Sequence, residues 1–286
     1  MNNSAATTDS TAQSHHRGIY DTISITEQKM IHQTVIIGKN TEIGENVEIG
    51  PYTVIGDNVK IGKNTRIAPH VVIEGPTTIG ENCHIFQFCS LGAIPQDLKF
   101  QEEDTELIIG DNNTFREYVT INRGTEGGAR KTILKNNIFL MAYSHVAHDC
   151  QIGDNVIMAN SATLGGHIII EDNAILGGLV GVHQYAHIGS YAMVGGLTGV
   201  SKDVPPYTIV VGERAKLHGL NLTGLKRHNF STEAIREIKS AYKTLFRSGL
   251  TIQKAIEKIA DEGLNSPEVA HLIDFIQNSE RGITRE

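Results

Sequence analysis

The segment VIIGKNTEIGENVEIG, residues 35–50, carries an aliphatic residue at every sixth position, and this repeat decides the fold. A small or β-branched residue comes two positions before each aliphatic one. Residues two apart point to the same side of a strand, so both sets face one core, while Gly or Asn supplies the corners. The repeat predicts a parallel β-helix with three short strands in each coil of about 18 residues. The aliphatic series reads Ile37, Ile43, Ile49, Ile55, Ile61, Ile67, Ile73, Ile79, Ile85 and Leu91.

The same repeat resumes after each of two interruptions and runs on to the pair Pro205-Pro206, where we expect it to end because proline cannot continue a strand ladder. The interruptions, near residues 93–106 and 125–131, do not fit the repeat. We expect both to be loops expelled from the coil, and such loops often carry function. The predicted domains are a β-helix at residues 30–212 and an α-helical C-terminal cap at residues 213–286.

Three helices are expected in the cap, because three residues there are suitable N-caps at the start of apolar periodic segments. These residues are Ser231, Thr251 and Ser266, the last followed by Pro267. Phe230 and Ile235 are also placed to form a hydrophobic staple around the first N-cap.

Composition excludes several classes of protein. The net charge of −7 argues against a nucleic-acid partner, and no apolar run approaches the ~20 residues of a membrane span. Cys83, Cys89 and Cys150 all fall on inward positions, so we interpret them as core residues and expect a reducing, cytoplasmic location. The first residues are polar, and we expect residues 1–29 to form a disordered leader.

Four histidines fall on one face of the predicted coil. His145 and His148 lie on a single rung, His167 comes 19 residues after His148, and His183 comes 16 residues later. Both separations are close to the length of one coil, and none of the four occupies an inward position. Imidazole is suited to general base catalysis near neutral pH, and a neighbouring carboxylate can fix its tautomer. The pair His148-Asp149 is therefore a candidate catalytic base.

Metal binding is the alternative interpretation of these histidines. Gamma-class carbonic anhydrases share the hexapeptide β-helix and hold zinc with three histidines from neighbouring coils. His148, His183 and His187 come near that spacing, but the last pair is one residue too close. We therefore predict no metal site.

The segment from Arg214 to Lys254 is basic although the whole chain is acidic. It contains nine Lys and Arg residues and two acidic ones, Glu233 and Glu237. A basic stripe is expected on one face of the first cap helix. A plain solvated face is one interpretation, and a docking site for an acidic partner is the other. The basic stripe consists of Arg236, Lys239, Lys243 and Arg247.

Three motifs stand out beside the repeat: Gln96-Asp97-Leu98-Lys99, His145-Val-Ala-His148-Asp149-Cys150 and Gly219-Leu-Asn221-Leu-Thr-Gly-Leu-Lys226-Arg227. Together they resemble the acyltransferase family that acylates UDP-N-acetylglucosamine from acyl carrier protein in lipid A biosynthesis. The resemblance covers roughly residues 31–250 and implies a left-handed β-helix in a homotrimer with active sites between subunits. It also implies transfer of an R-3-hydroxyacyl chain to the sugar 3-hydroxyl, with no cofactor beyond the carrier's phosphopantetheine thioester.

The resemblance implies a role for each matching residue. His148 corresponds to the general base, Asp149 to the residue that orients it, and the backbone N–H of Gly166 to an oxyanion donor. Gly196 corresponds to the position that sets acyl length, and the basic stripe to a dock for the acidic carrier protein. The chain departs from the family pattern at Asn122, Thr223 and His228.

Substrate contacts are implied at nine further positions. Those in the first expelled loop correspond to residues that position the sugar and the diphosphate. The histidines correspond to further substrate contacts, and the last three positions to contacts with the nucleotide or the pantetheine end. In chain order the nine are Gln96, Asp97, Lys99, His145, His167, His183, Gln184, Asn221 and Arg227.

Other functions remain open on the sequence alone. The same chemistry could act on a 3-amino UDP-sugar and form an amide. A coenzyme-A-dependent acetyltransferase could use the same scaffold without a carrier dock, and a zinc enzyme would need bound metal. A non-catalytic scaffold is disfavoured by the polar histidine face and the expelled loops.

Overall fold

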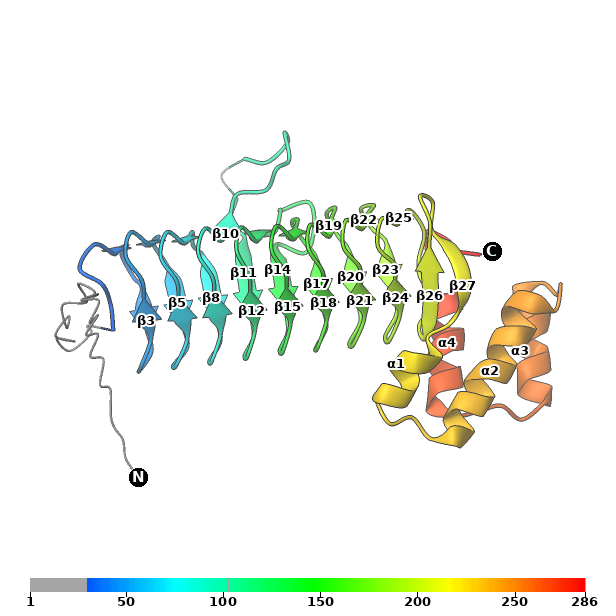
Figure 1. Ribbon diagram of the computed structural model, residues 1–286. Coiled ribbons are helices and arrows are strands. Elements are labelled where there is room, and N and C mark those ends of the chain that lie inside the picture. The colour runs from blue at the N-terminus through cyan, green and yellow to red at the C-terminus, as the bar shows by residue number, and fades with distance from the viewer. Residues whose placement is uncertain (1–29, 102, 286) are drawn as a thin grey trace, which may run out of the picture.

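The computed structural model describes residues 30–101 and 103–285, which form a long parallel β-helix with helices packed at its C-terminal end (Figure 1). The coil has three flat sheets, and strand n pairs in parallel with strand n+3 along almost its whole length. The predicted fold class, a left-handed parallel β-helix of hexapeptide repeats with a helical cap, is confirmed. The expected leader, residues 1–29, lies outside the described residues.

The nine-stranded sheet consists of β1 (Ile36–Ile37), β4 (Val54–Ile55), β7 (Val72–Ile73), β10 (Ser90–Ala93), β13 (Thr120–Asn122), β16 (His145–Val146), β19 (Thr163–Leu164), β22 (Gly181–Val182) and β25 (Gly199–Val200). The eight-stranded sheet consists of β2 (Glu42–Ile43), β5 (Val59–Ile61), β8 (Thr77–Ile79), β11 (Glu106–Ile109), β14 (Lys131–Leu134), β17 (Gln151–Ile152), β20 (Ile169–Ile170) and β23 (His187–Ile188). The ten-stranded sheet consists of β3 (Glu48–Ile49), β6 (Arg66–Ile67), β9 (His84–Ile85), β12 (Thr114–Phe115), β15 (Phe139–Leu140), β18 (Ile157–Met158), β21 (Ile175–Leu176), β24 (Met193–Val194), β26 (Thr208–Val211) and β27 (Lys216–Leu220).

The core consists of the two inward sets of the repeat. Residues such as Val71 and Ile73 are fully buried, as are Cys83, Cys89 and Cys150, which confirms that the cysteines are core residues. The first coil differs. Ile37 occupies an inward position but is exposed, because no coil stacks in front of it.

The expectation that Gly or Asn would supply the unusual dihedral angles of the corners is confirmed for Asn but not for the Gly that follows each inward aliphatic residue. The left-handed residue lies three positions after the inward aliphatic one and is often Asn, as at Asn46 and Asn64. Those two side chains also hydrogen-bond to each other, with 3.2 Å between Nδ2 of Asn46 and Oδ1 of Asn64. Gly is required for close stacking instead, since a Cβ on Gly62 would lie 2.5 Å from the carbonyl carbon of Gly80.

Both expelled loops leave the coil at the same corner, between the nine-stranded and eight-stranded sheets. The first lies between β10 and β11, and its described residues 94–101 and 103–105 project from the coil (Figure 1). The second connects β13 to β14 through residues 123–130. Every later coil turns the same corner, and His148 lies there between β16 and β17.

The C-terminal end corrects two expectations. The ladder continues past the proline pair, because β26 pairs in parallel with β24, and β27 then pairs with β26 as an antiparallel hairpin. Residues 216–220, placed in the helical cap by the sequence, thus form a strand whose Leu217 is buried. Four helices follow rather than three: α1 (Leu222–Arg227), α2 (Thr232–Arg247), α3 (Ile252–Asp261) and α4 (Pro267–Gln277). In the described part of the chain, no helix has the length and apolarity needed to cross a membrane.

A half-buried carboxylate joins the cap to the coil. The Glu171 carboxylate lies 3.0 Å from Nε2 of His187 in β23 and 2.9 Å from Nε2 of His271 in α4. Burial alone would raise the pKa of Glu171, but these contacts and the N–H of Ser190 hold it at about 2. The Glu171 contact raises the pKa of His271, whose Nδ1 lies 2.9 Å from the hydroxyl of Tyr207.

We expect this contact to make cap stability depend on pH. The Glu171 contribution is present above the ordinary carboxyl pKa of 4.5 and is lost as the pH falls toward about 2. The His271 contribution is fully present below 6.5 and is lost as the pH rises through its raised pKa. His271→Gln should therefore lower the thermal unfolding midpoint most between pH 5 and 6, roughly the interval between the two ordinary pKa values. A midpoint difference that stays constant into alkaline pH would contradict this assignment.

Candidate functional site

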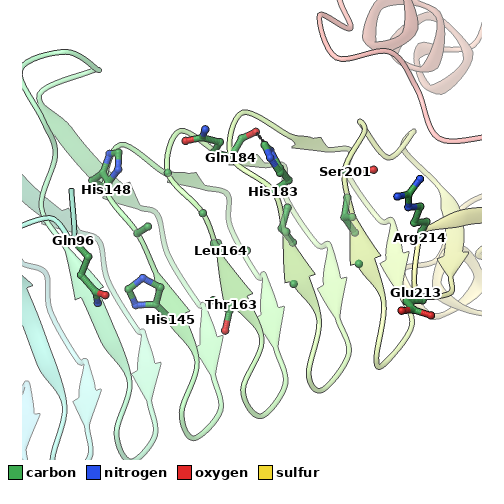
Figure 2. A pocket seen from close by; sticks show the side chains of 17 residues that line it. Gln96, His145, His148, Thr163, Leu164, His183, Gln184, Ser201, Glu213 and Arg214 are labelled. Atoms are coloured by element: carbon green, nitrogen blue, oxygen red, sulfur yellow. Dashed lines mark hydrogen bonds between the residues drawn. The ribbon is translucent and has the colours of Figure 1, made fainter. Parts of the chain in front are cut away.

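An open groove of ≈950 Å³ runs along the nine-stranded sheet and its corner with the eight-stranded sheet. Figure 2 shows His145 and Thr163 on the strands of the groove floor, with His148, His183 and Gln184 along the corner. The residues at the outward positions of successive strands become smaller toward the cap. In register they run His145, Thr163, Gly181 and Gly199, so the floor changes from polar side chains to bare backbone.

His148 and Asp149 form the pair that the sequence predicted. Nδ1 of His148 lies 2.8 Å from Oδ2 of Asp149, which fixes the tautomer with the proton on Nδ1 and leaves the lone pair on Nε2. Gly166 lies against the other side of the ring, where a Cβ would come within 2.7 Å of Nε2. The missing side chain leaves Nε2 accessible for proton abstraction.

The second expelled loop holds the Asp149 carboxylate. The hydroxyl of Thr125 donates to Oδ2 at 2.6 Å, and the backbone N–H of Thr125 donates to both oxygens at 3.1 and 3.2 Å. The carboxylate is buried, with a side-chain exposure of 1%. Burial alone would raise the pKa of Asp149, but the bonds from His148 and Thr125 hold it below its ordinary value. Asp149 is therefore a fixed anion behind the His148 ring.

Two further predicted histidines lie beside this pair. His145 Nδ1 lies 2.7 Å from the hydroxyl of Thr120, and burial followed by the charge of His148 lowers the pKa of His145. The His167 ring contacts the His148 ring edge to face at 4.9 Å. Burial is the main cause that lowers the pKa of His167. Both imidazoles therefore favour the neutral form, in which they can accept or donate a hydrogen bond.

His167 also stacks on the ring of Tyr185 in the next coil, with the centroids 4.4 Å apart. His183 and Gln184 are exposed in the same coil and line the groove. Nδ1 of His183 bonds to the carbonyl of Gln184 at 3.0 Å, which is the dashed contact in Figure 2. These residues therefore extend the groove by one coil toward the cap.

The first expelled loop reaches the groove through one of its predicted residues. Gln96 lines the groove beside His145 (Figure 2). Asp97 accepts a hydrogen bond from the backbone N–H of Lys99 at 2.9 Å. Its negative charge tends to raise the pKa of His167, although burial outweighs that effect. Leu98, between Asp97 and Lys99, is fully exposed. Asp97 and Lys99 themselves are not part of the groove lining within one chain.

Three further predicted residues also lie outside the groove of this chain. Gly196 is exposed at the corner between β24 and β25. Asn221 caps α1 instead, since its Oδ1 accepts from Gly224 N–H at 3.0 Å and its Nδ2 donates to the Tyr191 carbonyl at 2.9 Å. Arg227 is exposed at the end of α1. One chain does not bring these residues together with His148.

The zinc set considered from the sequence does not assemble within the chain. His187 belongs to the eight-stranded sheet and faces Glu171 and Phe275, whereas His148 and His183 line the groove. The ligand atoms of His148, Asp149 and His167 do lie within 4.8 Å of one another. In that group, however, Nδ1 of His148 and Oδ2 of Asp149 are already bonded to each other.

The basic stripe lies on α2, as predicted, but its four residues have two different surroundings. Arg236 forms an ion pair with Glu233. Lys239, Lys243 and Arg247 line a separate groove of ≈460 Å³ whose remaining residues are Leu220, Leu222 and Tyr242. The second groove thus combines an apolar floor with three basic side chains.

Several residues of the site were not predicted from the sequence, two of them behind the groove and two in its lining. Thr120 and Thr125 bond directly to the predicted site residues, yet a lone Thr carries no motif. The one available signal was that Thr125 begins an expelled loop. Glu213 and Arg214 line the end of the groove near the cap (Figure 2), and they come from the turn of the β26–β27 hairpin that the sequence did not reveal.

The fold and the site together define a hexapeptide-repeat transferase. The family described as bacterial transferase hexapeptide (six repeats) matches residues 29–63, 40–75, 58–93 and 131–166. The second domain of UDP N-acetylglucosamine O-acyltransferase matches residues 203–284.

Similar proteins narrow this class. The acyl-[acyl-carrier-protein]–UDP-N-acetylglucosamine O-acyltransferase of Thermodesulfovibrio yellowstonii is 54% identical over 89% of this chain and 99% of its own length. The same enzyme of Syntrophobacter fumaroxidans is 49% identical, again over 89% and 99%. The structure of LpxA from Acinetobacter baumannii superposes with a TM-score of 0.87 at 44% identity, covering 90% of this chain and all of that one. The chain belongs to the UDP-N-acetylglucosamine O-acyltransferase family.

Gly166 provides a test of the site geometry. A Cβ added there would lie 2.5 Å from Cε1 of His148, so Gly166→Ala must displace the ring. We expect kcat to fall about 100-fold, because a displacement of a catalytic group by about 1 Å lowers the rate by that factor. The thermal unfolding midpoint of the protein should be unchanged. Gly127→Ala is the matched control, because a Cβ there meets nothing within 4 Å. Wild-type kcat in Gly166→Ala would contradict the described position of His148.

Proposed function

We propose that this chain transfers an R-3-hydroxyacyl group from acyl carrier protein to the 3-hydroxyl of UDP-N-acetylglucosamine, the first step of lipid A synthesis. The observation that carries the proposal is the His148–Asp149 pair at 2.8 Å, open on its Nε2 side to the groove. Relatives named for this activity match the chain at about half identity over nearly their full length, which supports the same substrates.

The reaction follows from the geometry of the pair. Nε2 of His148 takes the proton of the sugar hydroxyl as its oxygen attacks the thioester carbonyl carbon. The imidazolium that forms is stabilised by the Asp149 anion, and the N–H of Gly166 donates to the oxyanion. When the intermediate collapses, the C–S bond breaks and the carrier thiolate receives the proton from His148. The step needs no cofactor beyond the carrier's phosphopantetheine thioester.

The remaining groove residues position the two substrates. Gln96 with Asp97 and Lys99 holds the sugar and diphosphate, while the histidines that line the groove contact the sugar. A 3-amino UDP-sugar would meet the same base and form an amide. Competition between the two nucleotides in one assay separates these acceptors, and preference for the amino sugar would replace the proposed one.

We propose that the active enzyme is a cytoplasmic homotrimer. Exposed apolar side chains lie along the corner between the ten-stranded and nine-stranded sheets, and such continuous patches typify interfaces. Association would also bring Gly196, Asn221 and Arg227 of a second copy toward the groove, as the family resemblance implies. The exposed residues are Tyr52, Phe88, Tyr118, Tyr143, Leu179 and Leu197.

The groove on α2 is the proposed docking site for the carrier protein. Its three basic side chains suit an acidic helical partner, and its apolar floor of Leu220, Leu222 and Tyr242 suits the partner's apolar residues. A coenzyme-A-dependent acetyltransferase on the same scaffold would have no use for this groove.

The base is tested by His148→Ala. We expect kcat to fall by a factor of about 10²–10⁴ with hydroxyacyl carrier protein and UDP-N-acetylglucosamine, because general base catalysis contributes that much. Light scattering should show the same mass as the wild-type protein. Turnover near the wild-type rate in a correctly assembled His148→Ala protein would show that His148 is not the general base.

The carrier dock is tested by the double variant Lys239→Glu and Lys243→Glu. We expect KM for the acyl carrier protein to rise at least tenfold, more at low salt, because close charge pairs across interfaces contribute about 1.5 kcal/mol or more each. Turnover of an acyl-pantetheine thioester, which lacks the protein, should be unchanged and serves as the control. Equal KM values for the carrier protein in the wild-type protein and the double variant would favour the coenzyme-A-dependent acetyltransferase.

A further inference from the structure

We infer that Thr125 is a positioning residue for catalysis: the hydroxyl of Thr125 holds Asp149 ionised and aimed at Nδ1 of His148. The inference rests on the proposed function, in which His148 is the base. The hydroxyl bonds to Oδ2 at 2.6 Å, and that is the same oxygen that faces His148 Nδ1 at 2.8 Å. Thr125 therefore acts on the reacting imidazole through a single carboxylate oxygen.

The loop around Thr125 is built to present it. Its carbonyl accepts bonds from the N–H groups of Gly128 at 3.2 Å and Arg130 at 3.1 Å, which close a tight turn. Gly128 lies directly against the carboxylate, where a Cβ would come within 2.4 Å of Oδ2 of Asp149. The turn thus closes over Asp149, and Thr125 itself is buried.

Few other groups could hold the carboxylate in this place. Nδ1 of His167, from the next coil, lies 3.8 Å from Oδ2, which is too far for a hydrogen bond. Asp97 in the first loop tends to raise the pKa of His167 through its charge. Thr132 Oγ1 accepts a hydrogen bond from the backbone N–H of Asp149 at 2.8 Å, so this hydroxyl bonds to the backbone and not to the carboxylate. Among the described residues, the side-chain donors bonded to the carboxylate are therefore Thr125 and His148.

Removing the hydroxyl has a defined chemical consequence. Without it the carboxylate loses a donor to its charged form, so the pKa of Asp149 rises. The active state needs ionised Asp149, so this change moves the acidic limb of the pH profile to higher pH. A merely structural role for Thr125 would lower stability without moving that limb.

The experiment compares three variants of the full-length enzyme. Thr125→Val removes the hydroxyl but keeps the backbone bonds of the turn, Thr125→Ser restores the hydroxyl, and Thr132→Val removes a matched hydroxyl that does not touch the carboxylate. For Thr125→Val we expect kcat to fall about tenfold, the acidic limb of kcat/KM to move up by about half a pH unit, and KM for UDP-N-acetylglucosamine to change less than about twofold. Thr125→Ser should recover most of kcat, and Thr132→Val should leave the limb in place.

A readout independent of turnover separates this inference from the proposed function. The tautomer of the His148 imidazole can be read by NMR with ¹⁵N-labelled histidine, its signals identified by their loss in His148→Gln. Thr125→Val should weaken the Nδ1-protonated tautomer, because the carboxylate is no longer held facing Nδ1, even if the acceptor sugar proves to be another. Identical pH profiles and identical tautomer signals in Thr125→Val and the wild-type protein would overturn the role of Thr125.

Discussion

Each coil of this protein is hydrogen-bonded to the coils before and after it through three short parallel strands, and this stacking constrains everything else. Because a coil spans 18 residues where it is regular, a residue sits directly above the one 18 positions earlier, as Thr163 sits above His145. The backbone of successive coils comes so close that Gly62 cannot carry a side chain. Side chains can project only at outward positions and at the corner positions that are not stacked glycines, so the functional groups lie there.

The stacking also explains why the site is assembled from pieces 18 residues apart. His148, His167 and Tyr185 occupy equivalent corner positions in consecutive coils or lie beside them, so their rings meet without any local motif that joins them. A groove of this kind is rigid, since each contributing residue is fixed by a ladder on either side. Such rigidity suits a base whose position decides the rate.

The repeat allowed much of this to be predicted, and its limits are equally physical. A period of six specifies inward and outward positions, so the buried cysteines and the histidine face follow directly from residue numbers. It does not specify what an expelled loop does, and so the partner of Asp149 could not be foreseen. Asn221 shows a second limit, because the same side chain that matches a family motif serves here as an N-cap for α1. The strand β27 was missed because Lys216–Leu220 carries no repeat, and it pairs only because Val210 offers an antiparallel edge.

The positions of the two insertions follow from what they serve. Both interrupt the same corner, in the two coils just before the one that carries His148. A loop expelled from that corner must pass beside the corner of the next coil, since the ladders leave it no other anchor. The first loop thereby delivers Gln96 to the groove, and the second delivers Thr125 to the far side of Asp149. Insertions at either of the other two corners would project from faces where no base lies. The imidazole is thus approached from one side by substrate contacts and supported from the other by the anion that the second loop holds.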